Sequence, residues 1–81
     1  MSQTIELDYP ITVNGEEISS LEISRRPKVR DMRKAQQAAS DDAGQELHLF
    51  AALTGRNPED LEELDLSDYR KLQQAYSDFL S

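Results

Sequence analysis

The 81-residue chain has no cysteine, and its three glycines stand alone. Without cysteine it can form neither a disulfide nor a thiolate metal site, and that composition fits a reducing compartment. Isolated glycines exclude a glycine-rich phosphate loop. No apolar run approaches the roughly 20 residues that cross a bilayer, and Met1-Ser2-Gln3-Thr4 lacks the pattern of a signal peptide. We therefore expect a cytoplasmic protein without membrane contact, built as a single domain over residues 1–81 with a thin core.

Positive charge is scarce, and it is unevenly spread. Sixteen acidic residues against nine basic ones give a net charge of -7, which disfavours nucleic acid as a partner. Six of the nine cations lie within ten residues: Arg25, Arg26, Lys28, Arg30, Arg33 and Lys34. The segment 57–81, by contrast, is rich in acids. This asymmetry can steer a partner toward the chain, or let copies of the chain associate head to tail.

The first part of the chain has the pattern of a β-hairpin, residues 3–24. Five apolar residues alternate with polar ones, as in a half-buried strand: Ile5, Leu7, Tyr9, Ile11 and Val13. Asn14-Gly15 is a strong signal for a two-residue turn, since type I′ geometry needs positive φ at both positions. The returning strand carries Ile18, Leu21 and Ile23.

A two-residue turn places Ile11 opposite Ile18. Further along the strands, however, the same register would set polar residues opposite apolar ones on the same face of the hairpin. One extra residue at Ser19-Ser20 repairs the pattern by setting Leu7 against Ile23, and Tyr9 against Leu21. We therefore predict a β-bulge at Ser19-Ser20. Pro10 cannot donate to a ladder, so its strand is predicted to lie at an edge.

The remainder, residues 27–81, reads as three to four helices. A first helix ending near Ser40 is expected to bury one stripe: Val29, Met32, Gln36 and Ala39. Asp42 and Gln45 resemble a capping box for the next helix. That second helix is the most apolar and hence is expected at the centre, through Leu47, Leu49, Phe50 and Leu53, with Gly55 as its C-terminal cap.

Two further helix starts follow. Asn57-Pro58 gives an N-cap and a proline at the first helical position, and Asp65 repeats the design. The last helix has an apolar stripe of Leu66, Tyr69, Leu72, Tyr76, Phe79 and Leu80. The predicted fold class is therefore α+β, an N-terminal β-hairpin followed by three to four α-helices.

Sites for chemistry are poorly supported. His48 is the only histidine and has no partner at ligand spacing, so we expect neither a metal nor a catalytic role for it. The acids between Glu59 and Asp68 lack the glycine of a calcium loop and sit where helix starts favour them. The basic stretch 25–34 is the best alternative, as a helix of a small nucleic-acid-binding regulator.

Three stretches together resemble a known family. They are the strand ending in Arg26-Pro27, the helix ending in Leu53-Thr54-Gly55, and the step Leu64-Asp65-Leu66-Ser67-Asp68 that opens the last helix. In this order and spacing, over about Ile5 to Leu80, the chain resembles the small tail assembly chaperones of contractile-tailed bacteriophages and prophages. One departure is Lys28, where a small hydroxyl residue would be the better helix cap.

The resemblance implies a non-catalytic protein without cofactor that acts in the host cytoplasm. Its implied partner is the tape measure protein, a long helical protein that sets tail length, and the tail tube protein then displaces the chaperone. A structural tail component is a further alternative. The candidate partner-binding residues are apolar or basic: Tyr9, Tyr69, Tyr76, Phe79, Arg26, Arg30 and Arg33.

Overall fold

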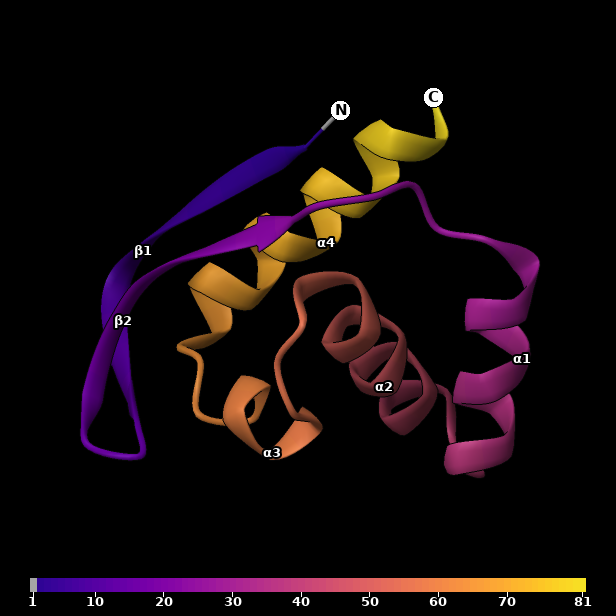
Figure 1. Ribbon diagram of the computed structural model, residues 1–81, viewed down its shortest axis with the longest axis horizontal. Coiled ribbons are helices and arrows are strands. Elements are labelled where there is room, and N and C mark those ends of the chain that lie inside the picture. Colours follow the sequence, from indigo (N-terminus) through magenta and orange to yellow (C-terminus); the bar gives the residue numbers. More distant parts are fainter. Residues whose placement is uncertain (1) are drawn as a thin grey trace.

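The computed structural model describes residues 2–81; Met1, which the predicted single domain includes, lies outside the described residues. Within that range an antiparallel hairpin precedes four helices (Figure 1). The elements are β1 Gln3–Val13, β2 Glu16–Ile23, α1 Val29–Ala38, α2 Asp42–Thr54, α3 Pro58–Leu61 and α4 Leu66–Leu80. The predicted α+β class is confirmed.

The hairpin turn forms as predicted. Asn14 and Gly15 both have positive φ, 53° and 81°, which is the geometry that Asn-Gly accepts without much strain. Ile11 lies opposite Ile18, also as predicted. Both strands are edges of the two-stranded sheet within residues 2–81, so Pro10 stands in an edge strand.

The bulge lies in the other strand. Ile5 pairs with Leu21, and the register shifts between Glu6 and Ile11 in β1, so the predictions of a bulge at Ser19-Ser20 and of Leu7 opposite Ile23 are wrong. Tyr9 likewise does not pair with Leu21. The cause is tertiary, because two backbone N–H groups of β1 donate to a side chain of α4 rather than to β2.

Helix α1 buries a different face from the one predicted. Val29 is 70% exposed and Met32 48%, whereas Asp31 and Ala35 are buried. The apolar stripe was therefore wrong, because the carboxylate of Asp31 turns inward to bind Arg25. The predicted basic helix 25–34 also begins later, at Val29, so that half of its cations precede it.

Helix α2 starts one residue earlier than the predicted capping box implies. Its N-cap is Asp41, whose carboxylate accepts the N–H of Gly44 at 3.1 Å, and Gln45 instead donates to the carbonyl of Ala39. A side chain at Gly44 would meet that carboxylate at 2.8 Å, so the cap favours glycine there. The C-terminal cap is Gly55 with φ 73°, as predicted.

The core lies between the hairpin, α2 and α4. Its largest fully buried apolar side chains are Phe50, Ile23, Leu53, Leu61 and Leu72. Helix α2 packs against α1, α3 and β2, which confirms its predicted central place, and α4 crosses the inner face of the hairpin (Figure 1). Both ends of the described chain meet at one edge, where Ser2 and Ser81 line a common hollow.

Helices α3 and α4 start as the sequence predicts. Asn57 and Asp65 are the N-caps, Pro58 follows the first of them, and the Asp65 carboxylate accepts the N–H of Ser67 at 3.0 Å. The predicted stripe of α4 is only partly buried, since Leu66 and Leu80 are 64% and 58% exposed. Within residues 2–81, none of the helices has both the length and the apolar character needed to cross a membrane.

Candidate partner-binding surface

The aromatic candidates of α4 share their surface with the core. Tyr69 and Tyr76 lie on Phe50, with ring centroids 5.7 and 5.4 Å away, and Phe79 packs against the same core cluster. All three are half-buried. Tilted and edge-on ring pairs of this kind stabilise the packing beyond the area they bury. A partner therefore meets only part of each ring.

Tyr69 is also tied down by a hydrogen bond. Its hydroxyl donates to Glu46 at 2.8 Å, and Gln73 donates to the same carboxylate oxygen at 2.9 Å. Burial first, and then the Glu46 carboxylate, raise the pKa of Tyr69 well above its ordinary value. The phenol is thus a fixed neutral donor that joins α4 to α2.

Tyr9 is the one predicted aromatic residue that faces mainly outward, with 61% of its surface exposed. Its position depends on Asp68, which is fully buried at the first turn of α4. The Asp68 carboxylate accepts the backbone N–H groups of Asp8 at 2.9 Å and Tyr9 at 3.0 Å. This contact holds the β1 bulge and carries the Tyr9 side chain to the surface.

Lys71 completes the attachment of β1 to α4. Its Nζ lies 3.4 Å from Asp68 and 2.9 Å from the Asp8 carboxylate, and it donates to the carbonyl of Glu6 at 3.1 Å. Burial raises the pKa of Asp68, but the N–H groups of Asp8 and Tyr9, with Lys71, more than offset it and hold the pKa below its ordinary value. The sequence analysis assigned Asp68 only to a helix start. The sequence signal for this contact was Pro10, which interrupts the hydrogen-bond ladder of β1 and so indicates that part of the strand pairs elsewhere.

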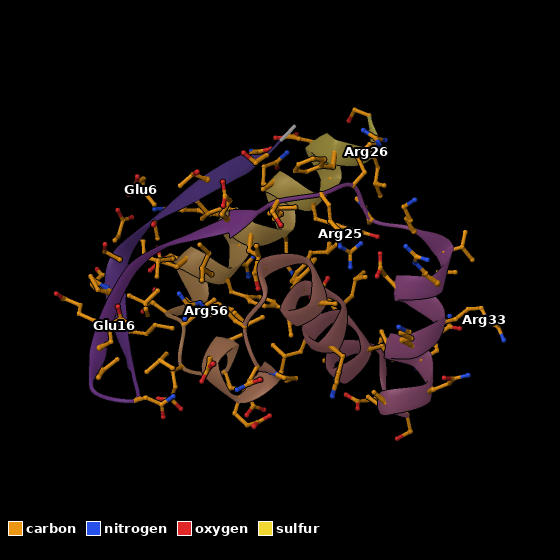
Figure 2. The ribbon with its side chains drawn as sticks, in the orientation of Figure 1. Glu6, Glu16, Arg25, Arg26, Arg33 and Arg56 are labelled. Carbon is orange, nitrogen blue, oxygen red and sulfur yellow. The ribbon has the colours of Figure 1, made fainter. Side chains whose placement is uncertain are left out.

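The basic candidates lie in two places: Arg26 precedes α1, whereas Arg30 and Arg33 are about one turn apart on that helix. Figure 2 shows Arg33 projecting from the outer side of α1, while Arg26 lies beside the end of α4, in a hollow that Phe79 also lines. Arg30 is exposed on α1. The structure therefore brings Arg26 and Phe79 together, whereas Arg30, Arg33 and Tyr9 stand on other elements.

Arg25, which was not among the candidates, has a structural partner. Its guanidinium binds both carboxylate oxygens of Asp31, at 2.7 and 2.8 Å, and Asp31 also accepts the N–H of Lys28 at 2.8 Å. The bidentate bond to Arg25 is the main reason that the pKa of Asp31 falls from 3.8 to about 2. This pair anchors the start of α1 and removes one cation from the free basic surface.

An apolar hollow that the sequence did not reveal lies where α2, α3 and the start of α4 meet; we call it the α2–α3–α4 groove. Its volume is about 470 Å³. The apolar lining is Leu47, Leu61, Leu64, Leu66 and Tyr69. The charged lining is acidic, Asp41 and Glu62. Because two stretches of the chain, 41–47 and 61–69, form it together, neither stretch alone marks it.

No metal centre is evident in residues 2–81, where no three His, Cys, Asp or Glu side chains converge as ligands. The ring of His48 instead lies 2.9 Å, at Nδ1, from the carbonyl of Gly44 one turn earlier in α2. Two acids of the calcium-like run bind helix starts, Asp60 at the N–H of Asn57 and Asp65 at that of Ser67.

Comparison with known proteins identifies the family. The model of the family described as "Phage tail assembly chaperone proteins, E, or 41 or 14" matches residues 4–81, nearly the whole chain. Neither the curated proteins nor the solved structures contain a match to the chain. The matched range includes the hairpin, the Asp68 attachment and the groove. The chain belongs to the family of phage tail assembly chaperones.

Proposed function

We propose that this chaperone binds the phage tape measure protein in the host cytoplasm and keeps it soluble until the tail tube protein displaces it. The observation that carries the proposal is the family match over residues 4–81. A long helical client exposes apolar stripes before assembly, and such stripes aggregate unless they are covered. Covering them is a binding task that needs no catalytic group.

The apolar surface of the chain supports this proposal. Among residues 2–81, large apolar side chains remain exposed on β1, on α1 and at the start of α4: Tyr9, Val29, Met32 and Leu66. Contacts through such separate residues are individually weak. Several copies along one client would nevertheless hold it firmly, and each copy would still be easy to displace.

The net charge of -7 supports the same task. Copies lined along a client would make the complex strongly negative, and like charge keeps assemblies from associating further. The nucleic-acid alternative gains less support, because Arg25 is bound to Asp31 and only Arg30, Arg33 and Lys34 lie on α1 among the basic cluster.

The test is a refolding assay with the tape measure protein of the same phage or prophage. That protein is diluted from denaturant with increasing amounts of the purified chaperone, and light scattering is recorded. We expect scattering to fall until several chaperones are present per client. A small unrelated protein of similar acidity is the control, and equal suppression by that control would contradict specific binding.

Particle composition separates the chaperone role from that of a structural tail component. We expect purified virions to lack this chain, because the tail tube protein replaces it during assembly. Quantitative mass spectrometry of virions against infected-cell lysate measures this directly. A constant number of copies per finished particle would favour the structural alternative.

A further inference from the structure

We propose that the α2–α3–α4 groove binds an amphipathic helix whose apolar stripe is flanked by lysine or arginine. The inference rests on the proposed function, in that it names the chemistry of the client segment that the chaperone covers. It is carried by the apolar lining of the groove, by the charge of its rim and by the state of the two helix N-termini that open onto it.

The lining of the groove includes apolar surface that the folded chain leaves accessible to solvent. Leu66 is the first residue of α4 and is mainly exposed, while Leu47 and Leu64 are half-buried around the same hollow. A single exposed leucine is ordinary on a protein surface. Here, however, the exposed leucine borders a concave space with two further leucines, so one apolar partner covers all three at once.

The charge of the groove selects a cationic partner. Both charged side chains that line it, Asp41 and Glu62, are acidic, and the exposed residues Asp42, Glu63 and Asp65 are sequence neighbours of lining residues. Complementary charge adds on-rate and specificity, and an acidic partner would be repelled. The rim therefore favours lysine or arginine on either side of the inserted stripe.

Helix N-termini often bind anions, and α2 and α4 both begin at this groove. At both helix starts a carboxylate already binds one of these donors, Asp41 the N–H of Gly44 and Asp65 that of Ser67. The two capping carboxylates therefore disfavour a negative ligand at these helix starts. The polar contribution to binding thus comes from cations at the rim.

A helix is the form that suits this groove. Its walls are α2, α3, the turn that follows α3 and the start of α4, whereas the free strand edges that pair with an extended peptide belong to the hairpin. Apolar anchors at i, i+3, i+4 and i+7 are how an amphipathic helix fills an apolar groove. Long helical clients present such stripes repeatedly, which fits binding by several copies.

Another occupant with the same chemistry exists in the chain itself. Helix α1 carries exposed Val29 and Met32 beside Arg30 and Arg33, and it lies on the other side of α2 from α3 (Figure 1). It cannot reach its own groove without unfolding, so it would enter that of a second copy. The experiment below distinguishes this occupant from a client helix.

The binding test uses two fluorescent model peptides with leucine at i, i+3, i+4 and i+7, one flanked by lysine and one by glutamate. Fluorescence anisotropy measures their affinity for the intact chain. We expect the lysine-flanked peptide to bind at least about tenfold more tightly than the glutamate-flanked one. Equal affinities would overturn the charge argument.

Matched variants locate the contact. Leu66→Gln is paired with Leu80→Gln, at the opposite end of the same helix and similarly exposed. We expect Leu66→Gln to weaken the lysine-flanked peptide about tenfold and Leu80→Gln to leave it unchanged. Glu62→Lys should weaken binding of the lysine-flanked peptide more than Glu17→Lys does, which makes an equal change of charge on β2. Equal losses within either pair would overturn the groove as the site, and circular dichroism checks folding.

Client binding and self-association are then read separately. If the tape measure protein is solubilised equally by the chain and by Leu66→Gln, the groove inference fails while the proposed function stands. If the peptides bind through the groove but the client is not solubilised by the unaltered chain, the groove stands and the proposed function fails. A third outcome is that neither peptide binds, while sedimentation shows that the unaltered chain forms oligomers which Leu66→Gln and Met32→Gln both lose. That outcome would assign the groove to a second copy of the chain and overturn the inference.

Discussion

At the scale of single residues, Asp68 is the most deeply buried charged side chain described in residues 2–81. It is fully buried, yet both carboxylate oxygens accept backbone N–H groups and Lys71 lies 3.4 Å away. Burying a carboxylate is costly unless it is hydrogen-bonded and paired. Here the pairing joins α4 to β1, so one side chain fixes the relation between two elements far apart in sequence.

Replacing Asp68 by asparagine tests that role. The amide NH2 group of asparagine is a donor, whereas both carboxylate oxygens of Asp68 are acceptors. In the variant, the backbone N–H of Asp8 or Tyr9 therefore faces another donor and is left without a partner. We expect the free energy of unfolding to fall by about 3 kcal/mol. Urea unfolding measures it, with Asp78→Asn, exposed on the same helix, expected within about 0.5 kcal/mol of the unaltered chain. Similar effects of the two variants would contradict the role assigned to Asp68.

Two carboxylates predict how stability depends on pH. The pKa of Asp31 is about 2 against an ordinary 3.8, and the pKa of Asp68 is also lowered. A carboxylate whose pKa is lowered by folding stabilises the folded state at pH values above its ordinary pKa. That stabilisation is lost as the pH falls through the pKa of the folded state. We therefore expect the free energy of unfolding to drop as pH falls from about 4 to about 2.

Urea titrations at a series of pH values check this expectation, and Asp31→Asn serves as the internal comparison. That variant has lost the carboxylate, so its stability should depend less steeply on pH over the same interval. An unaltered chain whose stability stays constant down to pH 2 would contradict the lowered pKa values.

At the scale of elements, the start of α1 is imperfectly capped. Lys28 has extended backbone angles typical of an N-cap, φ -123° and ψ 162°, but an ammonium group cannot accept the N–H groups that follow. Its own N–H is already bound by Asp31, the residue three positions on. Half of a capping box is therefore present.

Lys28→Ser completes that box. We expect the free energy of unfolding to rise by about 0.5–1 kcal/mol, because the hydroxyl accepts an N–H of the first turn. Thermal unfolding measures the gain. Lys34→Ser makes the same chemical change inside α1, where serine only lowers helix propensity, so it should give no gain. Stabilisation by both variants alike would show that lost charge, rather than capping, is the cause.

The elements also show what sequence reasoning can reach. The Asn14-Gly15 turn, the Gly55 cap and the Asn57-Pro58 helix start were predicted correctly, because each depends on residues that are neighbours in sequence. The β1 bulge was misplaced because Asp68, about sixty residues away, determines it. The register of a hairpin follows local pairing only where no distant side chain binds the backbone N–H groups that would otherwise pair the two strands.

The face of α1 was wrong for a similar reason. Periodicity assigned Val29 and Met32 to the core, but a carboxylate that pairs with Arg25 displaced them outward. The groove was missed entirely, since Leu47 of α2 and the leucines of residues 61–66 form it only when the two stretches pack together. Tyr9 is exposed by the bulge, whereas Tyr69 and Tyr76 serve the core around Phe50.

At the scale of the whole molecule, charge and apolar surface are distributed unequally. Figure 1 shows α1 on one side of α2 and α3 on the other. Arg30, Arg33 and Lys34 are exposed on α1, whereas acidic Asp41 and Glu62 line the groove next to α3. Such a small chain has a thin core, so some apolar surface remains outside it. Under the proposed function, that remaining surface is where a client helix would bind.

The measurement that tests this account most directly is the soluble fraction of the tape measure protein when it is co-expressed with the chain. We predict that the client is recovered in the soluble lysate and co-purifies with the tagged chain, and that it is insoluble when expressed alone. Leu80→Gln should preserve the effect, and Leu66→Gln should reduce it. A client whose soluble fraction is the same with and without the chain would contradict the proposed function.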